Sequence, residues 1–443
     1  MNPPPSNTHM ESLLLLVIIQ LVVIIAVARL FGQVFRRFGQ PVVCGEIAAG
    51  LLLGPSLFGR FFPETFHAIF NSDVGLVFSI FSQVGLVLLM FIIGMEFDFG
   101  HLSENRRTAM SISIVGILLP FVLGFSLGYL MHPRLGLTGS PLHFSLFIAA
   151  AMSITAIPIL GRIMIELNMN RTCIGSLTIS AAALDDATGW VILALVTAIS
   201  RSNLDPGKMA LMVVGVLLYA AAMILVVRPL LCRWTARMLL ANHGDLTLNV
   251  QATLLILMFL SAAVTNLIGI FSIFGGFMFG AILYDQHELR EALRQRIQDF
   301  VTVFFLPIFF TYTGLRTDIG SMQSASLWVW CILVMLAAVA GKFGGCTLAG
   351  YYSGLPLREA ALIGVMMNTR ALMELIVINI GYDLGVIPKS VFFMLVFMAV
   401  VTTYMTTPIL RRLARNTEVW DSYRASQFAA RFKSKGVAAT HLD

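Results

Sequence analysis

Long runs of apolar residues, separated by short polar segments, recur along the chain from the N-terminus to about residue 410. Many of these runs approach the ~20 residues that an α-helix needs to cross a bilayer. The runs lack the strict alternation of apolar and polar residues that marks the strands of a membrane β-barrel. The pattern therefore predicts an all-α polytopic membrane protein.

We predict thirteen transmembrane helices from this pattern. The second, ninth and tenth are short and rich in glycine or proline, and a charged amphipathic segment, residues 285–300, separates the ninth from the tenth. Such a segment favours a helix that lies on the membrane surface. The predicted spans are residues 12–35, 43–58, 75–98, 107–131, 143–167, 173–200, 208–234, 248–268, 270–284, 302–316, 326–352, 358–382 and 388–410.

Positive charge is distributed unevenly between the two sides of these spans. The C-terminal tail and the loops after odd-numbered spans, with the residues next to them, hold 20 of the 29 Lys and Arg residues, and the opposite loops hold 6. The positive-inside rule then predicts an outside N-terminus and a cytoplasmic C-terminus. Residues 1–11 would form an extracytoplasmic tail, 12–410 the transmembrane domain and 411–443 a short cytoplasmic tail.

Composition agrees with a membrane protein and excludes several other classes. Charged residues make up 12% of the chain, about half of the ~25% that soluble domains carry. The net charge of +6 follows from membrane orientation and does not indicate a nucleic-acid partner. The cysteines form no CxxC pair, the histidines show no ligand spacing, and no nucleophile–base pair is apparent. We therefore expect no cofactor, no disulfide framework and no enzymatic activity.

Two short patterns recur in the two halves of the chain. Spans 2 and 9 each carry glycines five residues apart, and spans 3 and 10 each end on a glycine followed four residues later by an aspartate. The offset of seven spans is odd, so the second copy would be inserted upside down. Two inverted six-helix repeats are typical of secondary transporters. The matched positions are Gly45 with Gly275, Gly50 with Gly280, Gly94 with Gly314, and Asp98 with Asp318.

Two adjacent aspartates, Asp185 and Asp186, lie near the middle of span 6, where a charged side chain indicates a function. Their helical positions point about 100° apart, so we expect one to face the ion path and the other a neighbouring helix. Burial and a like-charged neighbour both raise the pKa of a carboxyl group, whereas a nearby lysine lowers it. The pair predicts a coupled site that exchanges a proton for a hard cation. The alternative is a structural ion pair with Lys342 or Arg370.

Span 5 contains a proline, Pro158, in the segment AAAMSITAIPILGRIMIE. Proline removes a backbone hydrogen bond and crowds the carbonyl four residues earlier, here that of Ile154. The hydroxyls of Ser153 and Thr155 lie beside this break, and free carbonyls and hydroxyls at mid-membrane suit a dehydrated cation. A plain proline kink is an equally good interpretation of this motif alone.

Further ionisable residues lie in spans 11 and 12. Lys342, in the glycine-rich segment AGKFGG, is placed to pair with an aspartate, with snorkelling to the membrane surface as the alternative. Span 12, the repeat counterpart of span 5, carries Asn368, Arg370 and Glu374 at similar depth. Arg370 and Glu374 are four residues apart and can form a bridge on one helix face. We expect either a structural bridge or a direct role in the ion path.

Several of these segments together resemble the monovalent cation:proton antiporter-2 family. They are QPVVCGEIAAGLLLGPSLFG, SITAIPILGRIM, ALDDATGW, AGKFGG and MNTRALMELIVINIG, and the likeness extends from about residue 10 to 412. The segments SITAIP and MNTRALMELI are most similar to the plant-type cation/proton exchanger and potassium-efflux-like branch. The potassium-efflux systems differ in having Gln-Asp at the aspartate pair and a long nucleotide-binding domain, so the transported ion cannot be inferred from them.

The resemblance implies the sodium/proton-antiporter fold, with spans 4–6 and 11–13 as the core, spans 1–3 and 8–10 as the dimerisation domain, and spans 5 and 12 as unwound crossing helices. It implies that Asp186 is the main proton- and ion-binding carboxylate, with Asp185 as its partner. It further implies that Lys342 pairs with the essential aspartate, and that Thr155 and Ser153 line the metal site. Asn368, Arg370 and Glu374 would support this ion-site network.

The expected function is therefore exchange of Na⁺ or K⁺ for protons by a homodimer with elevator-like motion in the bacterial inner membrane. Two alternatives remain: a channel or uniporter with the same fold, and a carrier of organic anions with a related fold. Competition between protons and cations at two acids argues against the first. Two buried acids make an anion site unfavourable.

Overall fold

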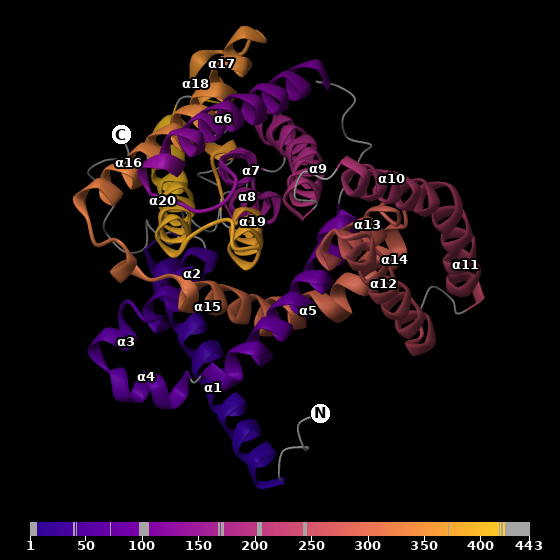
Figure 1. Ribbon diagram of the computed structural model, residues 1–443. Coiled ribbons are helices and arrows are strands. Elements are labelled where there is room, and N and C mark those ends of the chain that lie inside the picture. The colour runs from indigo at the N-terminus through magenta and orange to yellow at the C-terminus, as the bar shows by residue number, and fades with distance from the viewer. Residues whose placement is uncertain are drawn as a thin grey trace. The chain divides into compact units, whose positions relative to one another are not determined.

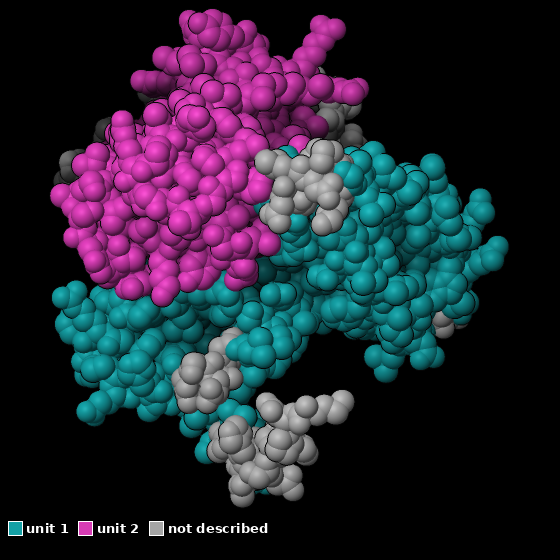
Figure 2. Space-filling view, in the orientation of Figure 1, with its two compact units in different colours: residues 1–32, 45–98, 197–317 teal, residues 33–44, 99–196, 318–443 magenta. Residues whose placement is uncertain are grey.

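The computed structural model of the chain describes residues 7–38, 40, 42–70, 72–96, 106–166, 169, 172–201, 206–241, 246–370, 372–415, 417 and 420. Regular secondary structure in these ranges is helical (Figure 1), as the continuous apolar runs predict. The described residues divide into two compact units (Figure 2). Asp98 and most of both predicted terminal tails lie outside the described residues.

Unit 1 comprises Met1–Gly32, Gly45–Asp98 and Thr197–Thr317. Its helices are α1 (Asn7–Arg37), α2 (Val42–Leu53), α3 (Phe58–Phe61), α4 (Pro63–Ile69), α5 (Ser72–Glu96), α10 (Pro206–Ala222), η2 (Met223–Val227), α11 (Arg228–Ala241), α12 (Leu248–Ile268), α13 (Ser272–Ala281), α14 (His287–Leu293), η3 (Arg294–Gln298), η4 (Val301–Phe305) and α15 (Leu306–Arg316), of which α1 and α2 extend into unit 2.

Unit 2 comprises Gln33–Cys44, Phe99–Val196 and Asp318–Asp443. Its helices are α6 (Arg106–Arg134), α7 (Pro141–Ser153), α8 (Ile157–Glu166), α9 (Cys173–Arg201), η5 (Ile319–Ser321), α16 (Ala325–Val339), η6 (Ala340–Gly344), α17 (Gly345–Tyr352), α18 (Leu357–Met367), α19 (Leu372–Asp383) and α20 (Lys389–Leu413), and the last residues of α9 belong to unit 1.

The described helices agree with a polytopic membrane protein. Nine of them are long and apolar enough to cross a membrane, and two bent helix pairs bring the number to as many as 11. The short apolar helices α7 and α13 fall where the fifth and ninth spans are predicted. A total of thirteen spans therefore stays a prediction.

Two of the repeat-matched glycines lie at equivalent helix contacts within unit 1. A Cβ atom at Gly45 of α2 would lie 2.4 Å from the carbonyl oxygen of Phe31 in α1. A Cβ atom at Gly275 of α13 would lie 2.5 Å from the carbonyl oxygen of Ser261 in α12. Both distances are too short for any side chain, so glycine is required for these close backbone approaches.

The other matched glycines also pair equivalently. A Cβ atom at Gly314 of α15 would lie 2.1 Å from the carbonyl carbon of Gly50 in α2. In the other half, a Cβ atom at Gly94 of α5 would lie 3.1 Å from the Cα atom of Gly280 in α13. The helix of span 2 thus contacts that of span 10 through the same pair of positions that joins span 9 to span 3.

The centre of unit 2 is formed by helices that are buried on every side. All residues of α7 from Phe144 to Ser153 are buried except the half-buried Leu146, and all residues of α19 from Leu372 to Gly381 are buried. Helices that are apolar all round belong in a protein core or in a bilayer, because no face prefers water. Helix α6 packs closely on α7 because a Cβ at Gly128 would lie 2.7 Å from the Cα of Ser145. Polar groups on α7 and α19 therefore find their partners only inside unit 2.

The amphipathic segment after α13 is helical, as predicted. It consists of α14 and η3, and Leu289, Leu293 and Ile297 are buried along one face. With the following η4–α15 it forms a helix pair bent by 40°. Its position at a membrane surface stays a prediction.

Candidate functional site

The first helix interruption of unit 2 lies between α7 and α8. Helix α7 ends at Ser153, Ile154 is extended with φ −81° and ψ 141°, and α8 begins at Ile157. Pro158 is the second residue of α8, a position where the missing N–H would have no helical partner anyway. The break predicted at this proline is present, and it leaves the last carbonyls of α7 without partners in their own helix.

A second interruption separates α18 from α19, which are bent by 43° relative to each other. Helix α18 ends at Met367, and Asn368, Thr369 and Arg370 precede α19. The two interruptions bind each other directly. The N–H of Ala156 donates to the carbonyl of Thr369 at 3.2 Å, and the hydroxyl of Thr155 donates to the carbonyl of Met367 at 3.1 Å. Each break thus provides hydrogen-bond partners for backbone groups that the other break leaves without a partner in its own helix.

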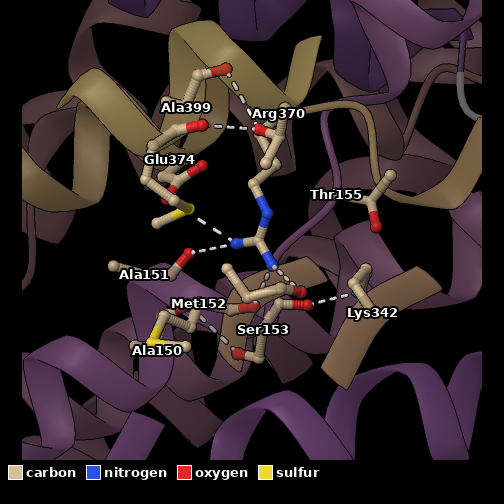
Figure 3. A network of polar contacts seen from close by, with 12 residues as sticks. Ala150, Ala151, Met152, Ser153, Thr155, Lys342, Arg370, Glu374 and Ala399 are labelled. Carbon is tan, nitrogen blue, oxygen red and sulfur yellow. Dashed lines mark hydrogen bonds and ion pairs between the residues drawn. The ribbon is translucent and has the colours of Figure 1, made fainter. Parts of the chain in front are cut away.

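Two buried cations cap the end of α7 (Figure 3). The guanidinium of Arg370 donates to the carbonyls of Ala151 at 3.1 Å and Met152 at 2.6 Å. The ammonium of Lys342 donates to the next carbonyl, that of Ser153. The C-terminus of a helix carries a partial negative charge, so cations there are favourable. In Figure 3 the two side chains reach this helix end from different elements.

Lys342 also holds one of the two aspartates. Its Nζ atom lies 2.7 Å from Oδ2 of Asp185, and both side chains are fully buried. The residue lies in η6, a five-residue π-helical turn between α16 and α17, and such turns are frequent at functional sites. Within this turn, a Cβ at Gly341 would lie 2.8 Å from the Cα of Pro120 in α6, so the glycine permits a close helix approach. The carboxylate of Asp185 also interacts with the hydroxyl and N–H of Thr155.

Asp186 occupies a different environment from its neighbour. It is fully buried, and neither of its oxygens accepts a hydrogen bond of normal geometry from the described residues. The indole N–H of Trp190, one helical turn further along α9, interacts with the carboxylate without reaching that geometry. The rotation of about 100° between adjacent helical positions separates the surroundings of the two acids. Both oxygens of Asp186 are therefore available to a ligand.

The Lys342 contact corrects one expectation from the sequence. The family resemblance implied that the lysine pairs with the essential aspartate, taken to be Asp186, but the structure pairs it with Asp185. Asp186 is the next residue along α9, and adjacent helical positions face directions about 100° apart, so the two acids have different neighbours.

Arg370 and Glu374 form a buried ion pair, with Nη1 and Oε1 3.6 Å apart. The pair lacks hydrogen-bond geometry, and neither oxygen of Glu374 has a hydrogen-bond partner among the described residues. Arg370 also donates to the carbonyl of Ala338 at 3.4 Å. The arginine is thus bound mainly by backbone carbonyls, and Glu374 balances its charge.

The remaining predicted residues also lie in unit 2. The hydroxyl of Ser153 is buried and donates to the carbonyl of Ala150 at 3.0 Å, so it turns back onto its own helix. Asn368 is buried at the second break, and its Oδ1 atom has no hydrogen-bond partner among the described residues. The described residues contain no group of three or more His, Cys, Asp or Glu side chains able to hold a metal ion.

Sequence reasoning missed the threonines of α20. The hydroxyl of Thr403 accepts from the N–H of Arg370 at 3.2 Å, and the hydroxyl of Thr369 donates to that of Thr406 at 3.4 Å. The available signal was TTYMTT, residues 402–407, a cluster of hydroxyls inside an otherwise apolar span.

Comparisons with known proteins give a consistent result. Residues 22–415 match the family model described as sodium/hydrogen exchanger, transmembrane. The chain is 38% identical over 405 residues to the Na⁺/H⁺ antiporter NhaS4 of Synechocystis sp., covering 90% of this chain and 97% of that protein. It is 34% identical over 401 residues to cation/H⁺ antiporter 17 of Arabidopsis thaliana, covering 90% of this chain but only 48% of the plant protein.

The fold also resembles a solved structure. The sodium proton antiporter MjNhaP1 from Methanocaldococcus jannaschii at pH 8 superposes with a TM-score of 0.63 and 16% sequence identity. The match covers 94% of this chain and 99% of that one. At this identity the likeness concerns the fold alone.

Proposed function

Because the chain belongs to the sodium/hydrogen exchanger family, we propose that it is a secondary active antiporter that exchanges Na⁺ or K⁺ for protons across a membrane. The observation that carries the proposal is the pair of buried carboxylates at the crossing of two helix breaks. One of them, Asp185, is held by Lys342 at 2.7 Å. The other, Asp186, has oxygens with no hydrogen-bond partner among the described residues.

Protons and cations would compete at Asp186. In its deprotonated form the carboxylate offers two oxygens that replace water around a hard monovalent cation, and in its protonated form it releases that cation. Thr155, which interacts with Asp185, and Ser153 lie at the first break and would complete the site with oxygen atoms. Asp185 would tune this competition through its charge, which Lys342 partly balances.

The fixed charges nearby would keep the broken helices in place during this exchange. Arg370 neutralises the end of α7 through the carbonyls of Ala151 and Met152, and Glu374 balances the guanidinium. When all are ionised, the five buried side chains of the site carry a net charge of −1, which one proton or one monovalent cation would neutralise. These side chains are Asp185, Asp186, Lys342, Arg370 and Glu374. The same backbone frame can then serve either substrate.

Transport would proceed by elevator-like alternating access. All proposed site residues belong to unit 2, so unit 2 would be the moving core, and unit 1 would provide the static domain and the homodimer contact. The matching glycine contacts of unit 1 support two inverted repeats within thirteen spans. We further propose an outside N-terminus, a cytoplasmic C-terminus and location in a bacterial inner membrane, because the basic residues favour the odd-numbered loops.

Exchange is tested with purified protein in liposomes that contain a pH-sensitive dye. Li⁺, Na⁺, K⁺ or Rb⁺ is added to vesicles with an imposed pH gradient, and an antiporter dissipates the gradient only with its own substrate cations. A channel or uniporter would move the cation alone, so the pH gradient would change only if a separate proton carrier were added. Asp186→Asn should abolish the response, whereas Asp383→Asn, at the exposed end of α19, should retain it. Full activity of Asp186→Asn would overturn the site assignment.

A further inference from the structure

Helix α20 carries four buried threonines beside the second break. The hydroxyl of Thr402 donates to the carbonyl of Met398 at 2.8 Å, and that of Thr403 donates to the carbonyl of Ala399 at 2.8 Å. Such bonds to the preceding turn are the usual way in which a helix satisfies a buried threonine. By this criterion alone, the two neighbouring residues are alike.

Among the described residues, only Thr403 of these two has a further hydrogen-bond partner outside its helix. Its oxygen accepts a hydrogen bond from the backbone N–H of Arg370 at 3.2 Å. This N–H lies in the second break, before α19 begins at Leu372. Thr403 therefore supplies the amide with an acceptor from another helix. Because Arg370 is fully buried, water cannot replace this acceptor.

The capped amide lies next to the contacts that join the two breaks. The carbonyl of Thr369 accepts from the N–H of Ala156 at 3.2 Å, and the carbonyl of Met367 accepts from the hydroxyl of Thr155 at 3.1 Å. Thr155 in turn interacts with the carboxylate of Asp185. Hydrogen bonds and the peptide groups between them thus connect Thr403 to Thr155, whose interaction with Asp185 links them to the aspartate pair.

We propose that Thr403 is a positioning residue for cation binding, which fixes the second break so that Thr155 faces the aspartate pair. The hydroxyl has one orientation available, since its hydrogen is directed at Ala399 and its lone pair at the Arg370 amide. This role rests on the proposed antiport function. It places a determinant of cation affinity on α20, outside both broken helices.

The test compares Thr403→Val with Thr402→Val in liposomes. Both changes remove one buried hydroxyl from the same helix at nearly constant volume, but only Thr403→Val leaves the Arg370 amide without an acceptor. We expect the cation concentration for half-maximal exchange to rise about tenfold in Thr403→Val, the factor that about 1.4 kcal/mol represents. The maximal rate should stay within about twofold, and Thr402→Val should match the unmodified protein.

Thr403→Ser supplies the rescue, because serine retains the hydroxyl and should restore the half-maximal concentration. The inference is overturned if Thr403→Val binds cations as Thr402→Val does, or if serine fails to rescue a folded, monodisperse protein. Equal losses in maximal rate and affinity would also overturn it, because they indicate general damage. Absence of cation-driven proton movement in the unmodified protein would instead refute the proposed function.

Discussion

Replacing Arg370 by methionine should destabilise unit 2 far more than neutralising its acidic partner. The change removes two short hydrogen bonds to carbonyls, at 3.1 Å and 2.6 Å. Each hydrogen bond from a charged donor contributes about 1.5–3 kcal/mol, so Arg370→Met should lower the free energy of unfolding by about 3–6 kcal/mol. This is a large part of the ~5–15 kcal/mol that typical proteins possess.

Glu374→Gln removes the partner charge but leaves these carbonyl contacts in place. Since the ion pair is 3.6 Å long and Glu374 has no hydrogen-bond partner among the described residues, we expect a loss of about 1–2 kcal/mol. This is below the ~3–5 kcal/mol typical of breaking a buried pair, because the remaining guanidinium is still surrounded by carbonyl oxygens.

The assay measures unfolding of the purified variants in detergent. Unfolding is monitored as the loss of the monodisperse peak in size-exclusion chromatography after heating to increasing temperatures. Arg370→Met, Glu374→Gln and the double variant form a cycle that isolates the pairwise term. The double variant should remain nearly as unstable as Arg370→Met, because the carbonyls stay uncapped. If Glu374→Gln is as damaging as Arg370→Met, the ion pair and not the carbonyl cap holds the helix end.

Three further outcomes are expected. Lys342→Gln should change the response of exchange to an imposed membrane potential, and an unchanged response would limit the lysine to a structural role. Gly280→Ala should destabilise the protein by about 1–3 kcal/mol because no side chain fits there, whereas Gly344→Ala, which meets no atom within 4 Å, should not. Thr155→Val should weaken cation binding in liposomes, and Thr178→Val, whose hydroxyl donates to the carbonyl of Ile174 in its own helix, serves as its control.

Local features of the sequence predicted much of the fold. Pro158 and its flanking hydroxyls located the first break because proline acts on the backbone of its own segment. The recurring glycines marked equivalent positions in the two halves, and the structure places them at equivalent helix contacts. The apolar runs predicted the helices because an α-helix needs ~20 mostly apolar residues to cross a bilayer.

Pairings across the sequence were harder to predict. The sequence showed that Lys342 could reach an acid, but the choice of Asp185 depends on the π-helical turn of η6 and the rotation of α9, neither of which has a local signal. The partners of Arg370 were missed for a related reason. A guanidinium and a carboxylate four residues apart suggest a pair, whereas the carbonyls that bind the arginine belong to a helix 219 positions away in the sequence.

The distance between Asp185 and Lys342 along the chain has a consequence for biosynthesis. The ribosome must add 157 residues after the aspartate before the lysine exists, which takes about 8–30 s at ~5–20 residues per second. Throughout this time the span with both acids is present without its ammonium partner. We therefore expect span 6 to become stable in the bilayer only after Lys342 has been synthesised and inserted.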